Sequence, residues 1–343
     1  MTQTRFQHTL DLISTMYHEK VVPGMSYLIF DHDQVIKKVV GLAEIKPHVE
    51  PLRDGMLYDL ASLTKVVATT PTIAWLMQEG QLNLDDCVHR FLPEINNRDV
   101  TIRNLLTHTA AIEGYIPHRN ELGHKALIQA LLTQETIGHN LNLNIAYTDI
   151  GYVYLGLIAQ RITGKPIQQL AQKLVIDRLD LGHEMTFHPD PHRAVPTEIN
   201  SRRGGLIRGT VHDPKGFILG EQCGSAGLFA SIEGLTKYGR SLIEQRLDGL
   251  LTEETMAKMF SDQTPLAGMH NRGFGWKLLH AHTADHHAMI FHPGFTGTFM
   301  ILDRAEDAGL IFLSNRVHPS ANNDAYLDWR ARIIAAYLID KES

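Results

Sequence analysis

Apolar residues recur along this chain of 343 residues at two spacings, one typical of helices and the other typical of strands. The pattern near residues 6–18 predicts an amphipathic helix. Strand-like runs follow over residues 25–30 and 35–41, and the polar residues 31–34 between them favour a turn. The N-terminal part of the chain is therefore expected to form a helix and then a β-hairpin.

The strand-like pattern returns near the C-terminus. Four further strands are predicted, at residues 274–279, 288–292, 298–302 and 309–313. A closing helix is expected over about residues 323–339. From residue 62 to about residue 260 the pattern is mostly helical, with start or stop signals at Thr101, at Thr148 or Asp149, at Gly164-Lys165-Pro166, at Ser231 and at Thr252.

Strands at both ends of the chain and helices between them predict an α+β fold, in which the two termini build one sheet. We expect a sheet lobe with flanking helices from residues 1–60 and 265–343. The middle of the chain, residues 61–264, is expected to form a mainly helical lobe packed against it. The two lobes would form one compact unit.

Composition and charge exclude several classes of protein. Hydrophobic residues make up 43% of the chain, and a net charge of −6 with interspersed signs gives no basic face for nucleic acid. The longest apolar run, residues 150–159, is too short to span a bilayer, and the polar N-terminus lacks the apolar core of a signal peptide. Two cysteines, Cys87 and Cys223, favour a reducing compartment. We expect a cytoplasmic protein without a membrane span.

Twenty histidines invite a metal hypothesis, but the sequence contains no His-Glu-x-x-His motif. Surface histidines explain the groups in residues 183–192 and 280–287 better than a metal site does. Gly-x-Ser-x-Gly, Gly-x-x-x-x-Gly-Lys and Gly-x-Gly-x-x-Gly motifs are also missing from the sequence. We therefore expect neither a metal nor a cofactor.

The chemistry is suggested first by Ser62-Leu63-Thr64-Lys65 at the predicted start of a helix. A serine needs a partner that removes its proton, and a lysine three positions along a helix projects from the same face. Unpaired N–H groups in the first helical turn could also stabilise an oxyanion. A plain N-cap with a solvated lysine is the alternative. Pro71 is expected to kink the helix about two turns in.

Two further segments are candidates for the same site. Tyr147 stands just before the helix predicted from Thr148 or Asp149, where it could relay a proton between Ser62, Lys65 and a leaving group. The alternative is an aromatic packing contact beside an N-cap. Residues 292–297, His-Pro-Gly-Phe-Thr-Gly, follow a predicted strand, and Gly294 would let a ligand approach the backbone. A simple turn with a surface histidine is the alternative there.

Together, and in this order, the three segments resemble the serine β-lactamase and penicillin-binding-protein family. The similarity is to its class C-like branch, which includes esterases and D-amino-acid-processing hydrolases. It extends from about residue 20 to residue 315, and further matching segments lie at residues 105–109, 152–165, 211–214 and 224–229.

The resemblance implies a role for each segment. Ser62 would be the acylated nucleophile, and Lys65 with Tyr147 would form the acid/base pair. The backbone N–H groups of Ser62 and Phe295 would form the oxyanion hole. The implied fold is a five-stranded antiparallel sheet flanked by terminal helices plus an all-α lobe, with the site between the lobes and no cofactor.

Departures from the family pattern bear on the substrate. The segment at residues 292–297 would usually begin with lysine and then threonine or serine, which hold a carboxylate. Here His292 is at best partly charged near neutrality, and Pro293 has no hydroxyl. Asp149 replaces a frequent asparagine and is expected to bind substrate or to pair with Lys65, which would shift the base role towards Tyr147. Gly294, Thr296 and His212 are the other expected substrate contacts.

These departures favour an esterase-like serine hydrolase acting on small, neutral esters or short acyl groups. A β-lactamase, a D,D-carboxypeptidase or a D-aminopeptidase is the enzymatic alternative, with an amide or β-lactam-like substrate. A non-catalytic binder on the same scaffold is the third hypothesis. The oligomeric state does not follow from the sequence.

Overall fold

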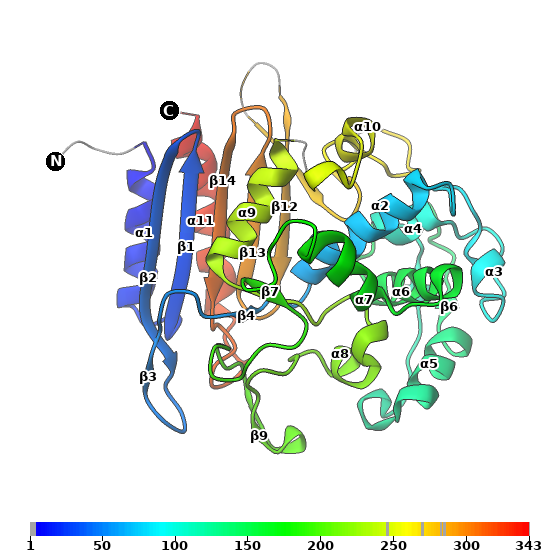
Figure 1. Cartoon of the computed structure of the whole chain (residues 1–343), viewed down its shortest axis with the longest axis horizontal. Helices are drawn as coiled ribbons and strands as arrows, with labels where there is room; N and C mark the ends of the chain where they lie inside the picture. Colours follow the sequence, from blue (N-terminus) through cyan, green and yellow to red (C-terminus); the bar gives the residue numbers. More distant parts are fainter. Residues whose placement is uncertain (1–4, 245–246, 269–270, 282, 284–285, 343) are drawn as a thin grey trace.

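The computed structural model describes residues 5–244, 247–268, 271–281, 283 and 286–342. A large sheet stands on one side of the molecule, and most of the helices lie on the other side (Figure 1). The terminal helices α1 (Gln7–His18) and α11 (Ala325–Lys341) pack together on one face of the sheet. Helix α9 (Ile232–Ile243) covers the opposite face. Both ends of the chain thus join the same sheet, as the sequence pattern predicts.

The large sheet is antiparallel at every pairing, and seven strands belong to it in the described part of the chain. In spatial order these are β11 (Lys277–His280), β12 (Ala288–Gly294), β13 (Thr298–Asp303), β14 (Ala308–Ser314), β1 (Gly24–Asp31), β2 (Gln34–Glu44) and β3 (Glu50–Pro51). The α+β class is confirmed. The number of five strands, which the resemblance implied, is wrong.

Within the large sheet, the strand that the sequence pattern did not predict is β3. It has only two residues, and one is Pro51, which has no N–H group to donate to a ladder. Such a residue is tolerated at a sheet edge, and β2 reaches it through an irregularity between Leu42 and Glu44. Two residues give no period from which a strand could be predicted.

β1 occupies the middle of the sheet, between β14 and β2. Seven of its eight residues are buried, because helices cover both faces of the sheet there. The predicted hairpin is confirmed, with Asp31 opposite Gln34 and a two-residue turn between them.

The region between β3 and β11 is mostly helical. Apart from α9, its α-helices are α2 (Thr70–Gln78), α3 (Val88–Phe91), α4 (Ile102–Thr107), α5 (His124–Thr133), α6 (Ile150–Thr163), α7 (Ile167–Ala171), α8 (Pro214–Leu219) and α10 (Glu253–Ala257). Short strands interrupt it, and three of them, β4 (Tyr58–Asp59), β10 (Phe229–Ala230) and β7 (Met185–Thr186), form a small sheet. Two-stranded pairs are β5 (Ile112–Glu113) with β6 (Thr136–Ile137), and β8 (Ile199–Asn200) with β9 (Gly205–Leu206).

Local signals position several of these helices. Thr101 caps α4 in a capping box with Asn104, which satisfies backbone N–H groups at both residues. Ser231 and Thr252 cap α9 and α10 through their side-chain oxygens, which accept from Gly234 N and Thr255 N. Gly164 ends α6 with a φ of 74°, a left-handed conformation that costs glycine little. These predicted boundaries are confirmed.

The helix after Ser62 differs from the predicted one. Residues Lys65–Thr69 form a π-helical turn, η1, and α2 begins only at Thr70. Pro71 therefore lies in the first turn of α2, where its missing N–H group is not needed. The π-helical turn thus places Pro71, which was expected to kink the helix, at the start of α2. The same turn begins three residues after the candidate nucleophile, Ser62.

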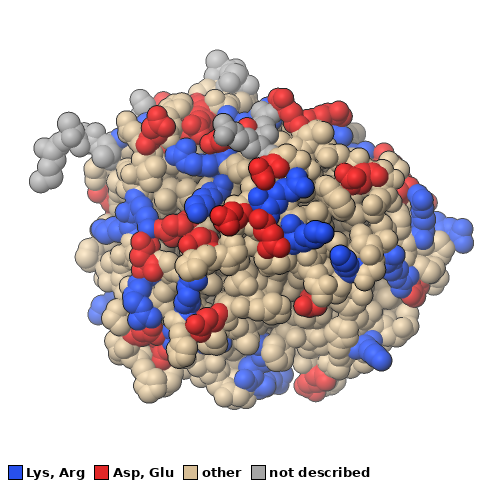
Figure 2. All heavy atoms as spheres, viewed as in Figure 1, with Lys and Arg blue, Asp and Glu red and all other residues tan. Residues whose placement is uncertain are grey.

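Two hydrophobic clusters fill the interior. The larger one joins the sheet to the helical region, and the smaller one joins the sheet to α1 and α11. In the described part of the chain, no helix combines the length and the apolar character needed to cross a bilayer. On the face seen in Figure 2, positive and negative side chains are intermixed.

Candidate active site

Ser62 lies in a tight turn that carries the chain from β4 into η1. Ala61 adopts a φ of 45°, and the N–H group of Ala61 donates to Oδ1 of Asp59 at 2.8 Å. The backbone is thus held in a conformation that a non-glycine residue rarely adopts, at the position next to the candidate nucleophile. Leu60 N donates to Leu228 O at 2.9 Å, which ties the turn to the small sheet.

Lys65 lies within hydrogen-bond distance of Ser62. Its Nζ donates to Ser62 Oγ at 2.8 Å, to Asp149 Oδ1 at 2.8 Å and to the carbonyl oxygen of Ser225 at 3.3 Å. The lysine is 0% exposed, so these three oxygens are its surroundings rather than solvent. The alternative interpretation of the sequence, a solvated lysine at the surface, is therefore wrong.

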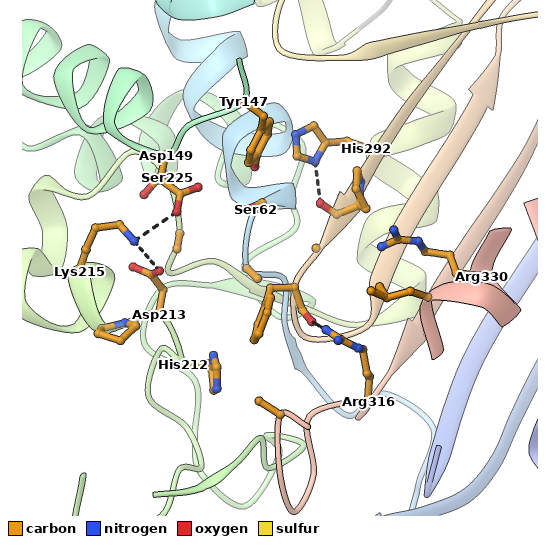
Figure 3. Close-up of a pocket in the computed structure, with 18 of the residues that line it drawn as sticks. Ser62, Tyr147, Asp149, His212, Asp213, Lys215, Ser225, His292, Arg316 and Arg330 are labelled. Carbon is orange, nitrogen blue, oxygen red and sulfur yellow. Dashed lines mark hydrogen bonds and ion pairs between the residues drawn. The ribbon is translucent and has the colours of Figure 1, made fainter. Parts of the chain in front are cut away.

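Asp149 links Lys65 to a second buried lysine. Its Oδ2 lies 3.2 Å from Nζ of Lys215, which also pairs with Asp213 at 3.0 Å. Figure 3 shows these contacts at the side of the pocket. The four side chains alternate in charge from Lys65 to Asp213, so the cluster is neutral as a whole.

Burial and pairing act in opposite directions on these groups. Burial disfavours the ammonium of Lys65, but the neighbouring Tyr147 and Asp149 outweigh it and hold the pKa of Lys65 above its ordinary value. Burial alone would raise the pKa of Asp149, yet Lys65 and Lys215 hold it well below its ordinary value. Both groups are therefore charged near neutral pH.

Tyr147 precedes α6, and Figure 3 shows its hydroxyl end directed towards Ser62. Two cations flank its ring, with Lys65 Nζ 5.1 Å and the guanidinium carbon of Arg272 5.9 Å from the ring centre. The residue is 47% exposed, so it is open to a ligand as well. The structure thus brings Ser62, Lys65 and Tyr147 together.

His108 holds Tyr147 in place, a contact that sequence reasoning did not assign. Its ring centre lies 4.5 Å from that of Tyr147. The His108 carbonyl accepts from Ala146 N at 2.8 Å, and Nδ1 accepts from Thr148 N at 3.5 Å. Burial, together with Arg272 and Lys65, lowers the pKa of His108 well below its ordinary value, so the ring is neutral. His108 lies within residues 105–109, a segment that resembles the family, and this resemblance was the sequence signal that could have pointed to His108.

His292 is fully buried in β12 and does not present a cation. Its Nδ1 lies 2.9 Å from the carbonyl oxygen of Pro293, so this nitrogen carries the proton, and no described group pairs with Nε2. Burial, and then Lys65 and Arg272, lower the pKa of His292 well below its ordinary value. At neutral pH the position expected to hold a substrate carboxylate is uncharged.

Gly294 brings β12 against the turn that carries Ser62. A Cβ atom at Gly294 would stand 2.5 Å from the Leu60 carbonyl oxygen, so a side chain would not fit. In the described part of the chain no acceptor takes the N–H group of Ser62 or that of Phe295. Ser62 and Phe295 both line the pocket, and an oxyanion hole requires backbone N–H donors that no acceptor within the protein occupies.

Arg316 and Thr296 hold the residues after Gly294 in place. Nη1 of Arg316 donates to the Phe295 carbonyl at 2.8 Å. The buried hydroxyl of Thr296 donates to the Asp59 carbonyl at 2.6 Å, so it fixes the Ser62 turn and does not line the pocket. The substrate contact expected at Thr296 is thus a contact within the protein.

His212 borders the pocket, as expected. Its ring stacks on Phe295 with centres 5.5 Å apart, and its Nε2 lies 2.8 Å from Oε2 of Glu198. The His212 N–H group donates to Oδ2 of the buried Asp59 at 2.6 Å. His212 therefore links the pocket wall to the turn that holds Ser62.

These residues surround one cavity of about 880 Å³. Ser62, Tyr147, Asp149, His212, His292 and Gly294 line it, which brings together segments from most of the chain. The lining also includes Lys215, Arg272 and Arg316, none of which sequence reasoning singled out. Lys215 directly follows the matching segment at residues 211–214, whereas nothing in the sequence pointed to Arg272.

A separate group of His287, Asp303 and Glu306 has the spacing of metal ligands. Lys341 of α11 lies among them, with Nζ 2.5 Å from Asp303 and 2.7 Å from Glu306. Because an ammonium already contacts both carboxylates, we describe this group as an ion-pair cluster between the sheet and α11.

Comparison with known proteins identifies the class. The Beta-lactamase family model matches residues 9–333, and the chain belongs to this family. It is accordingly an enzyme, a serine hydrolase of the β-lactamase-related group.

Three relatives illustrate the range of the family. An Escherichia coli (strain K12) protein named "Putative D-alanyl-D-alanine carboxypeptidase" is 27% identical over 352 residues, which cover 86% of this chain and 79% of that protein. A class C β-lactamase in complex with cefoxitin matches with a TM-score of 0.76 and 17% identity, over 98% of this chain and 100% of that one. EstCE1, "a hydrolase with promiscuous acyltransferase activity", matches with a TM-score of 0.75 and 18% identity, over 97% and 98%.

Proposed function

We propose that this enzyme hydrolyses small esters of short acyl groups through an acyl-enzyme on Ser62. The observation that carries the proposal is the 2.8 Å hydrogen bond between Lys65 and Ser62, with Tyr147 beside both. The site lies where the sheet lobe (residues 1–60 and 265–343) meets the helical lobe (61–264). Ser62 follows β4, His292 lies in β12, and Asp149 directly precedes α6.

In the first step Tyr147, as the phenolate, takes the proton of Ser62 Oγ, and Oγ bonds to the substrate carbonyl carbon. The carbonyl oxygen becomes an oxyanion that the N–H groups of Ser62 and Phe295 stabilise. The carbon–oxygen bond to the leaving group then breaks, and Tyr147 donates its proton to the leaving oxygen. In the second half of the reaction Tyr147 takes a proton from a water molecule, and the water oxygen bonds to the acyl carbon. The bond between that carbon and Ser62 Oγ then breaks, the acid leaves, and Tyr147 returns the proton to Ser62 Oγ.

Tyr147 is the better base because Lys65 is charged. An ammonium has no lone pair with which to accept a proton. The neighbouring Tyr147 and Asp149 outweigh burial and raise the pKa of Lys65, so the amine stays protonated through the neutral range. In this role Lys65 orients Ser62 Oγ, and with Arg272 it stabilises the negative charge of the phenolate.

A burst of p-nitrophenol from p-nitrophenyl acetate or butyrate tests the proposal. We expect a burst close to one equivalent per active site, followed by slower turnover, and we expect Ser62→Ala to abolish both. Thr64→Ser, two residues further along the chain and buried, is the control for a substitution close to Ser62 that keeps its hydroxyl group. No release across acetate to octanoate esters would contradict the proposal.

The relatives support a second candidate, a D,D-carboxypeptidase or β-lactamase activity. The relative from Escherichia coli carries a D-alanyl-D-alanine carboxypeptidase name, and a structural neighbour binds cefoxitin. The neutral His292 argues against it, because it offers no charge to a substrate carboxylate. Hydrolysis of nitrocefin, or a stable fluorescent-penicillin adduct on Ser62, would favour this candidate. A cytoplasmic location remains a prediction, which the free Cys87 and Cys223 support.

A further inference from the structure

The pocket is richer in positive than in negative side chains, although the chain carries a net charge of −6. Its carboxylates at Asp149 and Asp213 already pair with Lys215, Glu198 contacts His212, and Asp324 lies 3.9 Å from Arg316. In the described part of the chain, no carboxylate lies within ion-pair distance of four pocket cations. These are Arg119, Arg272, Lys277 and Arg330.

Arg272 differs from the other three in its contact with the Tyr147 ring. Arg119 and Lys277 are exposed, whereas Arg272 and Arg330 are both partly buried. Its backbone is fixed, because its carbonyl accepts from Gln263 N at 2.8 Å and it forms a β-bridge with Lys277. Among the described residues no oxygen accepts a hydrogen bond from its guanidinium, which instead faces the Tyr147 ring at 5.9 Å.

Such an arrangement leaves the partly exposed guanidinium of Arg272 without an acceptor from the described part of the protein. A guanidinium remains charged in proteins and has five N–H donors, so removing it from water without an acceptor is unfavourable. Burial accordingly lowers the pKa of Arg272. The ring contact with Tyr147 uses one face of the guanidinium and none of its N–H groups. A planar anion would satisfy two of these donors at once.

We propose that Arg272 binds a carboxylate on the leaving group of the substrate. The inference rests on the proposed function, because a leaving group exists only if Ser62 is acylated. Tyr147 delivers the proton to the leaving oxygen, and Arg272 stands over the same ring, so the part of the substrate beyond that oxygen faces Arg272. Arg272 thereby replaces the charge that the neutral His292 lacks, and the substrate class changes from neutral esters to esters with an anionic leaving group.

Two esters that share an acetyl group test the proposal. 4-Acetoxybenzoate has a carboxylate on its leaving phenol, and 4-acetoxybenzamide has a neutral group of nearly the same shape. We expect Arg272→Gln to lower the ratio of the two kcat/KM values by about 10- to 100-fold, mainly through the KM of the benzoate. Arg272→Lys keeps the charge but loses the planar pair of donors, so an intermediate ratio is expected.

The matched control is Arg330→Gln. It removes one positive charge from the same pocket, on the side away from Tyr147 (Figure 3), and should change the ratio by less than about threefold. Calorimetric binding of 4-hydroxybenzoate gives a readout that does not depend on turnover, and Arg272→Gln should weaken it by the same factor.

Two results would overturn the proposal. One is an unchanged ratio and unchanged 4-hydroxybenzoate binding in Arg272→Gln. The other is an equal fall in kcat for both esters, which would mean that Arg272 only holds the Tyr147 ring. If the wild-type enzyme turns over neither ester, the acyl-enzyme proposal itself fails, and the binding measurement still shows whether Arg272 takes a carboxylate.

Discussion

At the scale of single residues, Asp149 decides which group can act as the base. It contacts Lys65 and Lys215 with its two oxygens, at 2.8 and 3.2 Å. A carboxylate between two ammonium groups keeps both protonated, because each proton lost would leave the carboxylate less compensated. Lys65 is therefore a donor to Ser62 Oγ in the resting enzyme, which supports the proposal that Tyr147 acts as the base.

Asp149→Asn separates the two assignments of the base. Removing the carboxylate lowers the raised pKa of Lys65, so the amine loses its proton at a lower pH than in the wild type. If Lys65 must stay charged, kcat/KM at pH 8 falls by at least about tenfold and the alkaline limb of the profile moves to lower pH. If neutral Lys65 were the base, kcat/KM near neutrality would rise instead. The pH dependence of p-nitrophenyl acetate hydrolysis distinguishes the two.

The matched control for this change is Asp213→Asn. Asp213 pairs with Lys215 but not with Lys65, and its Oδ1 accepts from Gly216 N at 2.7 Å. Asparagine can still accept that hydrogen bond, so the N-cap of α8 is kept. A shift of the alkaline limb as large as that in Asp149→Asn would contradict a specific role for the Lys65 pair.

At this scale the sequence located the reacting groups but not all of their partners. Ser62, Lys65 and Tyr147 could be found because each lies in a short segment with a helix signal beside it. Arg272 could not, because its significance arises from a position next to Tyr147, 125 residues earlier in the chain. Thr296 was expected to face the substrate, but its direction is set by a hydrogen bond to Asp59, which no local pattern predicts.

At the scale of elements, the contact between β12 and the Ser62 turn fixes the spacing of the site. Gly294 lies so close to this turn that an added Cβ would meet the Leu60 carbonyl at 2.5 Å and would also collide with the Thr298 hydroxyl. A hydrogen bond from Thr298 Oγ1 to Leu60 O, at 3.2 Å, holds this hydroxyl and this carbonyl in place. A displacement of the strand would move the N–H group of Phe295, which we propose as an oxyanion donor, away from Ser62.

Gly294→Ala is therefore expected to reduce kcat by about 10²-fold or more, because one misplaced oxyanion donor has an effect of this size. Gly123→Ala is the matched control, since nothing lies within 4 Å of its added Cβ and it should keep the wild-type rate. Steady-state rates on p-nitrophenyl butyrate, with circular dichroism to compare folding, make the measurement. Wild-type kcat in Gly294→Ala would contradict the proposed oxyanion hole.

Elements with a clear period or cap were predictable, and those made by tertiary contacts were not. The β1–β2 hairpin, α4 with its Thr101 cap and α6 with its Gly164 end follow from local sequence. The two-residue strand β3 exists only because β2 provides an edge. The π-helical turn after Ser62 arises where a buried lysine must point into the site and Pro71 follows closely.

At the scale of the whole molecule, ion pairs fasten the terminal helix to the sheet that supports the site. Lys341 of α11 is 1% exposed and contacts Asp303 of β13, which is fully buried. Among the described residues, Lys341→Ala leaves the Asp303 carboxylate with His287 as its ion-pair partner and with the N–H groups of Ala305 and Glu306 as donors to its Oδ1. We expect the free energy of unfolding to fall by about 3 kcal/mol, measured by urea denaturation, because an uncompensated buried charge has a cost of this order.

The double variant Lys341→Ala/Asp303→Asn is the control for this prediction. It removes the charge as well as its partner, so it should recover part of the lost stability. The kcat of the folded enzyme should stay close to wild type in both variants, because the cluster is separate from the pocket lining. A double variant less stable than Lys341→Ala would contradict the charge argument.

We propose that Ser62 becomes covalently acylated, with Tyr147 transferring the proton and Lys65 orienting Ser62 Oγ. Mass spectrometry of enzyme quenched during turnover of p-nitrophenyl butyrate tests this proposal most directly. We expect one added butyryl group, located by peptide mapping on Ser62 and missing from Ser62→Ala. Continued hydrolysis with no added group on Ser62, at the same rate in the Ser62→Ala variant, would contradict it.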